Sequence, residues 1–154
     1  SSDTNSGGWN ASAIRGILNG ITYNSLSIKS NIKKVKKVKK DYILTYNVAS
    51  TEKTEDYLWL LSCGEIWDNG YNGGVTRGVA IATEGKQYKY YKMNLGSTSY
   101  SSPSDVTKKV KDSSWWLRSP CYNSETFNSI DEGGICRSWY HAAVGLWIAP
   151  SFSI

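Results

Sequence analysis

The feature that most constrains the fold of this 154-residue chain is the continuous apolar run Tyr57–Leu61, which passes directly into Ser62. Successive apolar residues over this length are typical of a strand that is buried on both faces. Ser62 and Glu65 have the Ser-x-x-Glu spacing of a capping box, so a short helix carrying Ile66 and Trp67 is expected to follow. A buried strand that leads into a short helix favours mixed structure over a helical bundle.

The N-terminal part of the sequence predicts another short helix. Ile14, Ile17 and Leu18 fall on one face of such a helix. Asn10 can cap its start, and the Asn-Gly pair at residues 19–20 would end it.

Strands are expected at several later points. Residues 42–48 are rich in β-formers, and Trp115–Pro120 has the pattern of a strand that ends at a proline. Two short apolar patches lie between residues 127 and 135. Phe152 and Ile154 alternate with serines, which predicts a final half-buried strand. The expected class is α+β, with two short helices, small antiparallel sheets and long loops.

The length of the chain fits a single domain, which we place at residues 8–154 after a linker remnant at residues 1–7. No stretch is long and apolar enough to insert in a membrane, and no signal peptide opens the chain. We therefore expect a domain of a longer protein whose targeting information lies elsewhere. The sequence has 7 Trp and 11 Tyr against 2 Phe, and Trp and Tyr suit half-buried positions and binding surfaces.

The net charge of +5 depends on a lysine-rich stretch at residues 29–40, without which the rest of the chain is mildly acidic. Such a stretch could bind phosphates of a nucleic acid. It also fits a solvated strand edge on which lysines prevent unwanted pairing. No cluster of arginines or glycine-rich nucleic-acid motif accompanies it, so we favour the strand edge and expect no nucleic-acid partner.

Catalytic and metal chemistry finds little support in the sequence. His141 is the only histidine, so a Cys–His enzyme would have to pair it with Cys121 or Cys136, and no nucleophile motif surrounds them. A Cys121–Cys136 disulfide stays open as an alternative. Asp131 and Glu132 could offer oxygen ligands to calcium, but adjacent acids in a glycine-containing loop are more often solvated. We predict no catalytic residue, no cofactor and no metal ion.

Arg118 lies within the otherwise apolar stretch Trp115–Pro120. A guanidinium in such a place needs a fixed acceptor. The first interpretation is a structural arginine that pairs with an acid or with loop carbonyls, and the second is a contact to a ligand.

The motif WWLRSP at Trp115–Pro120 is followed by a Gly-x-x-x-Ala-Pro-x-Phe-x-Ile ending at residues 145–154. Together with Gly7-Gly8-Trp9 and the turn at residues 84–88, this pattern resembles a domain of unknown function that is widespread in gut bacteria and their phages. That family is similar to C-type-lectin-fold proteins, including the formylglycine-generating-enzyme-like branch and the variable proteins of diversity-generating retroelements. The sugar-binding triplets of calcium-dependent lectins and the cysteine pair of the formylglycine-generating enzyme are both absent.

The resemblance implies a C-type-lectin-like fold with a buried scaffold and a presented surface. The implied scaffold residues are Trp115, Trp116, Arg118, Pro120, Pro150 and Phe152. The segment between them, residues 121–147, would be the variable surface that binds a ligand. The residues expected to contact the ligand are Tyr122, Asn123, Glu125, Asn128, Asp131, Glu132, Arg137, Trp139, Tyr140, His141 and Trp147.

The expected function is therefore non-enzymatic recognition of a protein or glycan receptor, at the end of a phage tail or on a bacterial cell surface. One alternative is a formylglycine-generating-like or Cys–His enzyme. Another is a structural module that caps a fibre or oligomerises, with the Trp139–Trp147 face buried between subunits. Assembly of a homo-oligomer through the parent protein also stays open.

Overall fold

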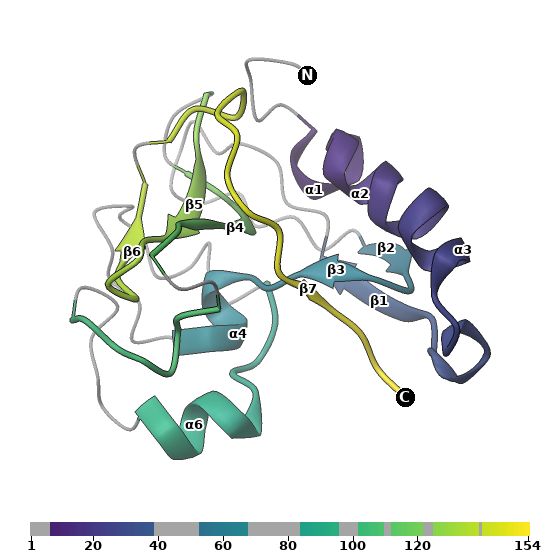
Figure 1. Cartoon of the computed structure of the whole chain (residues 1–154), viewed down its shortest axis with the longest axis horizontal. Coiled ribbons are helices and arrows are strands. Elements are labelled where there is room, and N and C mark those ends of the chain that lie inside the picture. Colours follow the sequence, from purple (N-terminus) through teal and green to yellow (C-terminus); the bar gives the residue numbers. More distant parts are fainter. Residues whose placement is uncertain are drawn as a thin grey trace.

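Short helices and small antiparallel sheets make up the part of the chain that the computed structural model describes, namely residues 7–38, 53–67, 84–95, 102–109, 112–121, 125–138 and 140–154 (Figure 1). The helical elements are α1 (Gly8–Ala11), α2 (Ala13–Ile17), the π-helical turn η1 (Leu18–Thr22), α3 (Tyr23–Ser25), the 3-10 turn η2 (Lys29–Asn31), α4 (Cys63–Trp67) and α6 (Lys89–Leu95). The strands are β1 (Val35–Val38), β2 (Lys53–Asp56), β3 (Trp59–Leu60), β4 (Trp115–Pro120), β5 (Phe127–Ile130), β6 (Cys136–Arg137) and β7 (Pro150–Ser151). The α+β class is confirmed. The strand expected at residues 42–48 and most of the linker expected at residues 1–7 lie outside the described residues.

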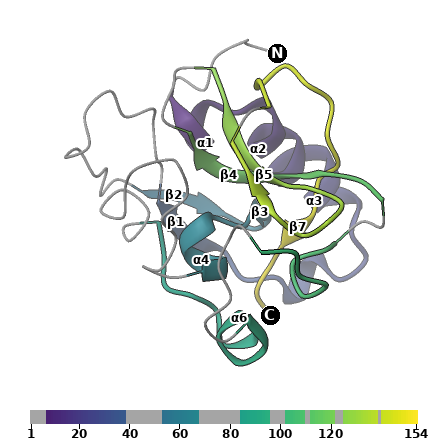
Figure 2. The ribbon, with the colours of Figure 1, turned by 90° about the vertical axis from the view of Figure 1, so that its left-hand side faces the viewer.

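The described strands form three small sheets, all with antiparallel pairing. β1 pairs with β2, β3 pairs with the C-terminal β7, and β4, β5 and β6 form a three-stranded sheet. The segment α1–α3 and helix α6 lie on different sides of these central strands (Figures 1 and 2). No helix of the described part is both long and apolar enough to cross a bilayer.

The predicted N-terminal helix exists but does not end at Asn19 as expected, because helical turns continue to Ser25. Asn19 has tertiary partners that compensate for its poor helix propensity: its amide donates to Leu58 O at 2.8 Å, and its Oδ1 accepts from Tyr57 N at 2.7 Å. The cap of α2 is Ser12, whose hydroxyl accepts from the backbone N–H of residue 15 at 3.0 Å. Asn19 thus attaches the helical segment to the start of the apolar run 57–61.

The apolar run is buried as predicted, since residues 58–61 are between 2 % and 4 % exposed. Its side chains contribute to two core clusters. Leu61 packs with Trp115, Leu117, α4 and α6 in the first cluster, whereas residues 58–60 pack with Trp9 and Trp116 in the second. Trp115 belongs to the first cluster and Trp116 to the second, because successive side chains of a strand point to opposite faces. Strand β4 therefore contributes to both clusters, and its six residues are all buried.

Two elements differ from expectation. Helix α6 was not predicted: Tyr91 and Leu95, spaced by one helical turn, are 3 % and 4 % exposed in the first cluster. The expected half-buried C-terminal strand is limited to Pro150–Ser151, and Phe152 and Ile154 are 45 % and 69 % exposed. The backbone nevertheless continues to pair, because Lys33 N donates to Ser153 O at 2.8 Å.

Gly134 shapes the connection between β5 and β6. Its φ is +81°, and a Cβ added there would lie 2.6 Å from Thr107 Oγ1 and even closer to the Ser104 carbonyl oxygen. We expect Gly134→Ala to lower the free energy of unfolding by about 2–4 kcal/mol, measured by urea denaturation of the full chain. Gly145→Ala is the matched control, since no atom lies within 4 Å of its added Cβ. Equal losses in the two variants would contradict the close approach of residues 104–107 to this turn.

Candidate functional site

Trp147 has a fixed backbone and an exposed side chain. Its backbone N–H donates to Ser114 O at 3.1 Å, and its carbonyl accepts from Trp116 N at 3.0 Å, forming a parallel bridge beside β4. The indole is 60 % exposed. The buried β4 therefore holds a large aromatic side chain on the surface at a defined position.

Further apolar side chains are exposed along the same C-terminal segment. Val144 is 40 % exposed and Ile148 is 37 % exposed, followed by Phe152 and Ile154. Five large apolar side chains within eleven residues exceed the scattered exposure that is normal for a folded surface. We use the name C-terminal face for the exposed residues Val144, Trp147 and Ile148 together with Glu125 and His141, which are described next. Val144 N donates to His141 O at 2.9 Å, and Ala142 N donates to Glu125 O at 2.8 Å.

The structure brings two of the predicted ligand-contacting residues, Glu125 and His141, together on the surface. Glu125 and His141 are 55 % and 60 % exposed, and His141 Nδ1 lies 3.4 Å from Glu125 Oε2. The backbone supports this pair through an antiparallel bridge between Thr126 and His141. Tyr140, half-buried, packs edge-on against the ring of Trp116 with the centroids 6.3 Å apart. His141 is thus exposed, as a residue that contacts a ligand would have to be.

Other predicted contact residues have structural roles. Asn128 is fully buried, and its amide donates to the carbonyls of Ser119 and Pro120 at 3.2 and 3.3 Å, so its side chain does not face the surface. Asp131, 8 % exposed, accepts from Ile135 N at 2.8 Å and from Arg137 Nε at 2.6 Å. Those two contacts hold the connection between β5 and β6.

Of the remaining predicted contact residues, one is exposed and three lie outside the described residues. Glu132 is exposed, and its carboxylate accepts from the Ser114 hydroxyl at 3.5 Å. Tyr122, Asn123 and Trp139 lie outside the described residues.

Arg118 is the centre of a buried polar network, which confirms its interpretation as a structural arginine. The side chain is 1 % exposed. Its Nη1 donates to Leu60 O at 2.7 Å and to Glu65 Oε2 at 2.5 Å, and its Nη2 donates to Glu84 O at 2.6 Å. An acid and two carbonyls therefore serve as the acceptors that a buried guanidinium requires.

The hydrogen bonds of Glu65 confirm the predicted capping box, and its carboxylate also pairs with Arg118 and Lys37. Its Oε2 accepts from Ser62 N at 3.1 Å, and its own N–H donates to the Ser62 hydroxyl at 3.2 Å. Burial alone would raise the pKa of Glu65, but Arg118 and Lys37 outweigh this effect and place that pKa below the ordinary value. The carboxylate consequently stays ionised at neutral pH.

Lys37 and Tyr88 complete this group, and neither is among the predicted site residues. Lys37 Nζ lies 2.7 Å from Glu65 Oε1 and 2.6 Å from Tyr88 Oη, and the Tyr88 hydroxyl donates to Glu65 Oε1 at 3.0 Å. The ammonium also lies 4.1 Å from the centroid of the Trp59 ring. Burial lowers the pKa of Lys37, opposed by the Glu65 carboxylate. The partners are dozens of residues apart in the chain, so no local pattern could reveal them.

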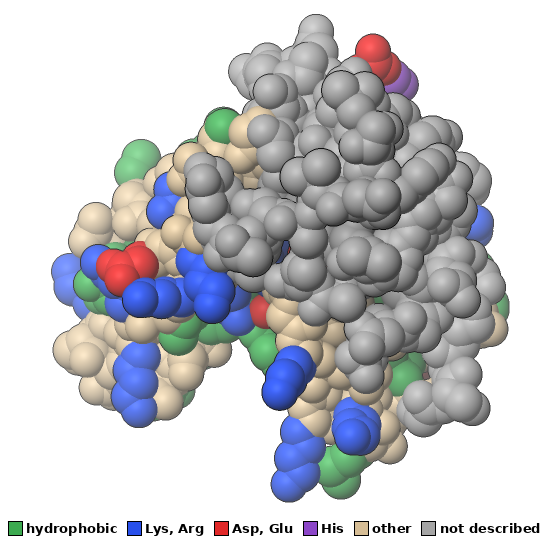
Figure 3. Space-filling view, turned by 180° about the vertical axis from the view of Figure 1, so that it is seen from behind, with side chains coloured by type: hydrophobic (Ala, Val, Ile, Leu, Met, Phe, Trp, Pro, Cys, Tyr) green, Lys and Arg blue, Asp and Glu red, His purple; other side chains and the backbone are tan. Residues whose placement is uncertain are grey.

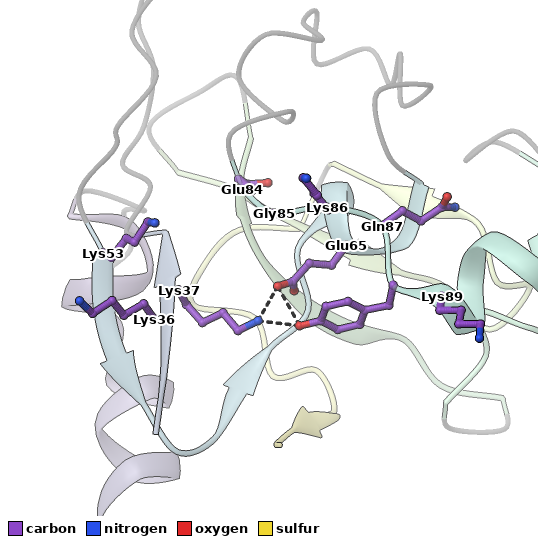
Figure 4. Close-up of a pocket in the computed structure, with 10 residues that line it drawn as sticks. Lys36, Lys37, Lys53, Glu65, Glu84, Gly85, Lys86, Gln87 and Lys89 are labelled. Carbon is purple, nitrogen blue, oxygen red and sulfur yellow. Dashed lines mark hydrogen bonds and ion pairs between the residues drawn. The ribbon is translucent and has the colours of Figure 1, made fainter. Parts of the chain in front are cut away.

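These residues line a pocket of about 480 Å³ between the β1–β2 sheet and residues 84–89 (Figure 4). In the figure Lys37 reaches toward Glu65 at the centre. The lysines that line the pocket are Lys36, Lys37, Lys53, Lys86 and Lys89.

The cysteines lie in the core rather than at the pocket or the C-terminal face. Cys63, Cys121 and Cys136 are free and buried, so no disulfide joins Cys121 to Cys136. Burial raises the pKa of the Cys63 thiol well above its ordinary value, and its neighbour Cys136 adds to the effect. A nucleophilic cysteine requires the opposite shift. Within the described ranges, no three His, Cys, Asp or Glu side chains are grouped as metal ligands would be.

Comparison with curated proteins and with solved structures finds no significant match. The model of one family, a domain of unknown function (DUF6273), matches residues 1–154. Since this match spans the whole chain, the protein belongs to the DUF6273 family.

Proposed function

We propose that this domain is a non-enzymatic recognition module that binds a protein or glycan receptor through the C-terminal face. The observation that carries the proposal is Trp147, whose backbone is hydrogen-bonded on both sides while its indole is 60 % exposed. A large aromatic side chain held at a fixed place loses little conformational entropy when a partner covers it, and such residues dominate binding energy at interfaces.

The chemistry around Trp147 suits a receptor surface. Val144 and Ile148 are further exposed apolar side chains of the same segment, while Glu125 offers an acceptor and His141, whose carbonyl accepts from Val144 N, offers a donor. An apolar centre with polar groups at its edge is the usual composition of an interface. The buried strand β4 fixes the backbone of Trp147 within this segment.

The finer proposal is a C-type-lectin-like fold and a variable protein of a diversity-generating retroelement, displayed on a phage tail or a bacterial cell surface. Its support is the resemblance of WWLRSP and the C-terminal motif, together with the contrast between the buried β4 and the exposed side chains of His141, Val144 and Trp147. The enzyme alternative is disfavoured by the buried thiols. A fibre-capping module would instead bury Trp147 between subunits, which light scattering of the full chain would report as an oligomer.

Several copies of this gene from one population test the variable surface. We expect substitutions to concentrate at exposed positions of residues 121–147, such as Glu125, Glu132 and His141, while Trp115–Pro120 and residues 149–154 stay constant. Buried positions inside the segment, such as residues 128–130, should also stay constant, since each is fully buried. Substitutions spread evenly along the chain, or equally frequent at buried positions, would contradict the proposal.

A further inference from the structure

The pocket lined by Lys37 and Glu65 has a chemistry that the recognition proposal does not use. Five lysines line the pocket, and lysine and arginine side chains are also prominent on the described part of the face shown in Figure 3. Its volume of about 480 Å³ is within the range of small-molecule sites, roughly 300–1,000 Å³.

The two carboxylates of the pocket lie beside two cationic side chains of the protein: Lys37 and Arg118 pair with Glu65, and Glu84 raises the pKa of Arg118 through its charge. Glu65, 2 % exposed, is paired with Arg118 at 2.5 Å and with Lys37 at 2.7 Å. Glu84 is also 2 % exposed, and its Oε2 accepts from the Ser119 hydroxyl at 2.5 Å. Their negative charge therefore does little to offset lysines at the mouth of the pocket.

The lysines at the mouth are exposed and come from two separate parts of the chain. Lys53 begins β2, whereas Lys86 and Lys89 belong to the segment that enters α6 (Figure 4). Among the described residues none of these three ammonium groups forms an ion pair with a carboxylate. Positive charges around a hollow with low-dielectric walls concentrate the electric field and attract anions.

The wall of the pocket is built to keep this shape. Gly85 has a φ of +141°, and an added Cβ would lie 3.0 Å from Glu65 Cγ, so glycine lets the segment 84–89 approach the buried network closely. The close contact at Gly85 therefore fixes the backbone position from which the Lys86 side chain extends. Lys37 and Tyr88 form the floor of the pocket, and both are hydrogen-bonded to Glu65.

From this arrangement we infer that the pocket binds a small ligand bearing a phosphate or sulfate group. Lysine ammonium groups bind such oxyanions as point charges. A doubly charged group gains more than a single carboxylate does from several lysines around one pocket. This inference is independent of the C-terminal face.

Isothermal titration of the full chain with inorganic pyrophosphate, galactose 6-sulfate and neutral galactose tests the inference and separates the two oxyanions. We expect at least one oxyanion to bind with a Kd of about 1 mM or below, weakening as salt rises, while galactose does not bind. The double variant Lys53→Gln/Lys86→Gln should weaken binding at least about tenfold. Both lysines are exposed, so the fold should be unaffected.

The control is Lys29→Gln/Lys92→Gln, which removes the same charge from exposed positions outside the pocket and should retain binding. Trp147→Ala should retain it as well, which distinguishes this site from the C-terminal face. Absence of oxyanion binding below about 10 mM, or equal weakening in the two double variants, would overturn the inference.

Discussion

Replacing Arg118 with methionine is expected to lower the free energy of unfolding by about 3–5 kcal/mol. The guanidinium is 1 % exposed and binds Glu65 together with the carbonyls of Leu60 and Glu84. Its removal leaves Glu65 buried with Lys37 as its remaining cationic partner. Because a domain is typically stable by about 5–15 kcal/mol, this one change removes a large part of the total. Thermal unfolding should show a midpoint lower by roughly 6–20 °C.

Two further variants identify the cause. Arg118→Lys keeps the charge but cannot reach all three acceptors at once, so its loss should be intermediate. Lys108→Met breaks the exposed pair between Lys108 and Asp105, whose atoms lie 2.7 Å apart, and should leave the midpoint unchanged within error. If Arg118→Met unfolded at the same temperature as the unchanged chain, the network would have no part in stability.

The strand-to-helix junction at residues 57–67 could be predicted because its signals are local. A run of apolar side chains must be buried, and the capping box places both of its hydrogen bonds within four residues. Arg118 was predictable for a similar reason, since a charge inside an apolar strand requires acceptors. The sequence did not say which acceptors these would be.

The remaining features depend on contacts between distant segments. The helix continues past Asn19 because residues 57 and 58 supply its hydrogen bonds. Lys37 is one of many lysines in its stretch, and only its partner Glu65 distinguishes it. Asn128 has the composition of a surface residue but pairs with the carbonyls of β4, so its amide is buried. None of these partners follows from periodicity or propensity.

The exposed Trp147 gives the second large expected effect. When this side chain anchors a receptor, Trp147→Ala should weaken binding by about 30-fold or more, since truncation of such an aromatic anchor typically costs at least about 2 kcal/mol. The fold should be unaffected, because the indole is 60 % exposed and alanine keeps both backbone hydrogen bonds.

The most direct test of recognition through the C-terminal face is the binding of the labelled full chain to a panel of intact bacterial strains and immobilised glycans. The matched control is Met93→Ala on α6, where another large apolar side chain is 72 % exposed away from this face. We predict saturable binding to at least one member of the panel, lost in Trp147→Ala and retained in Met93→Ala. Absence of saturable binding across the panel, or equal binding by Trp147→Ala and the unchanged chain, would contradict the account.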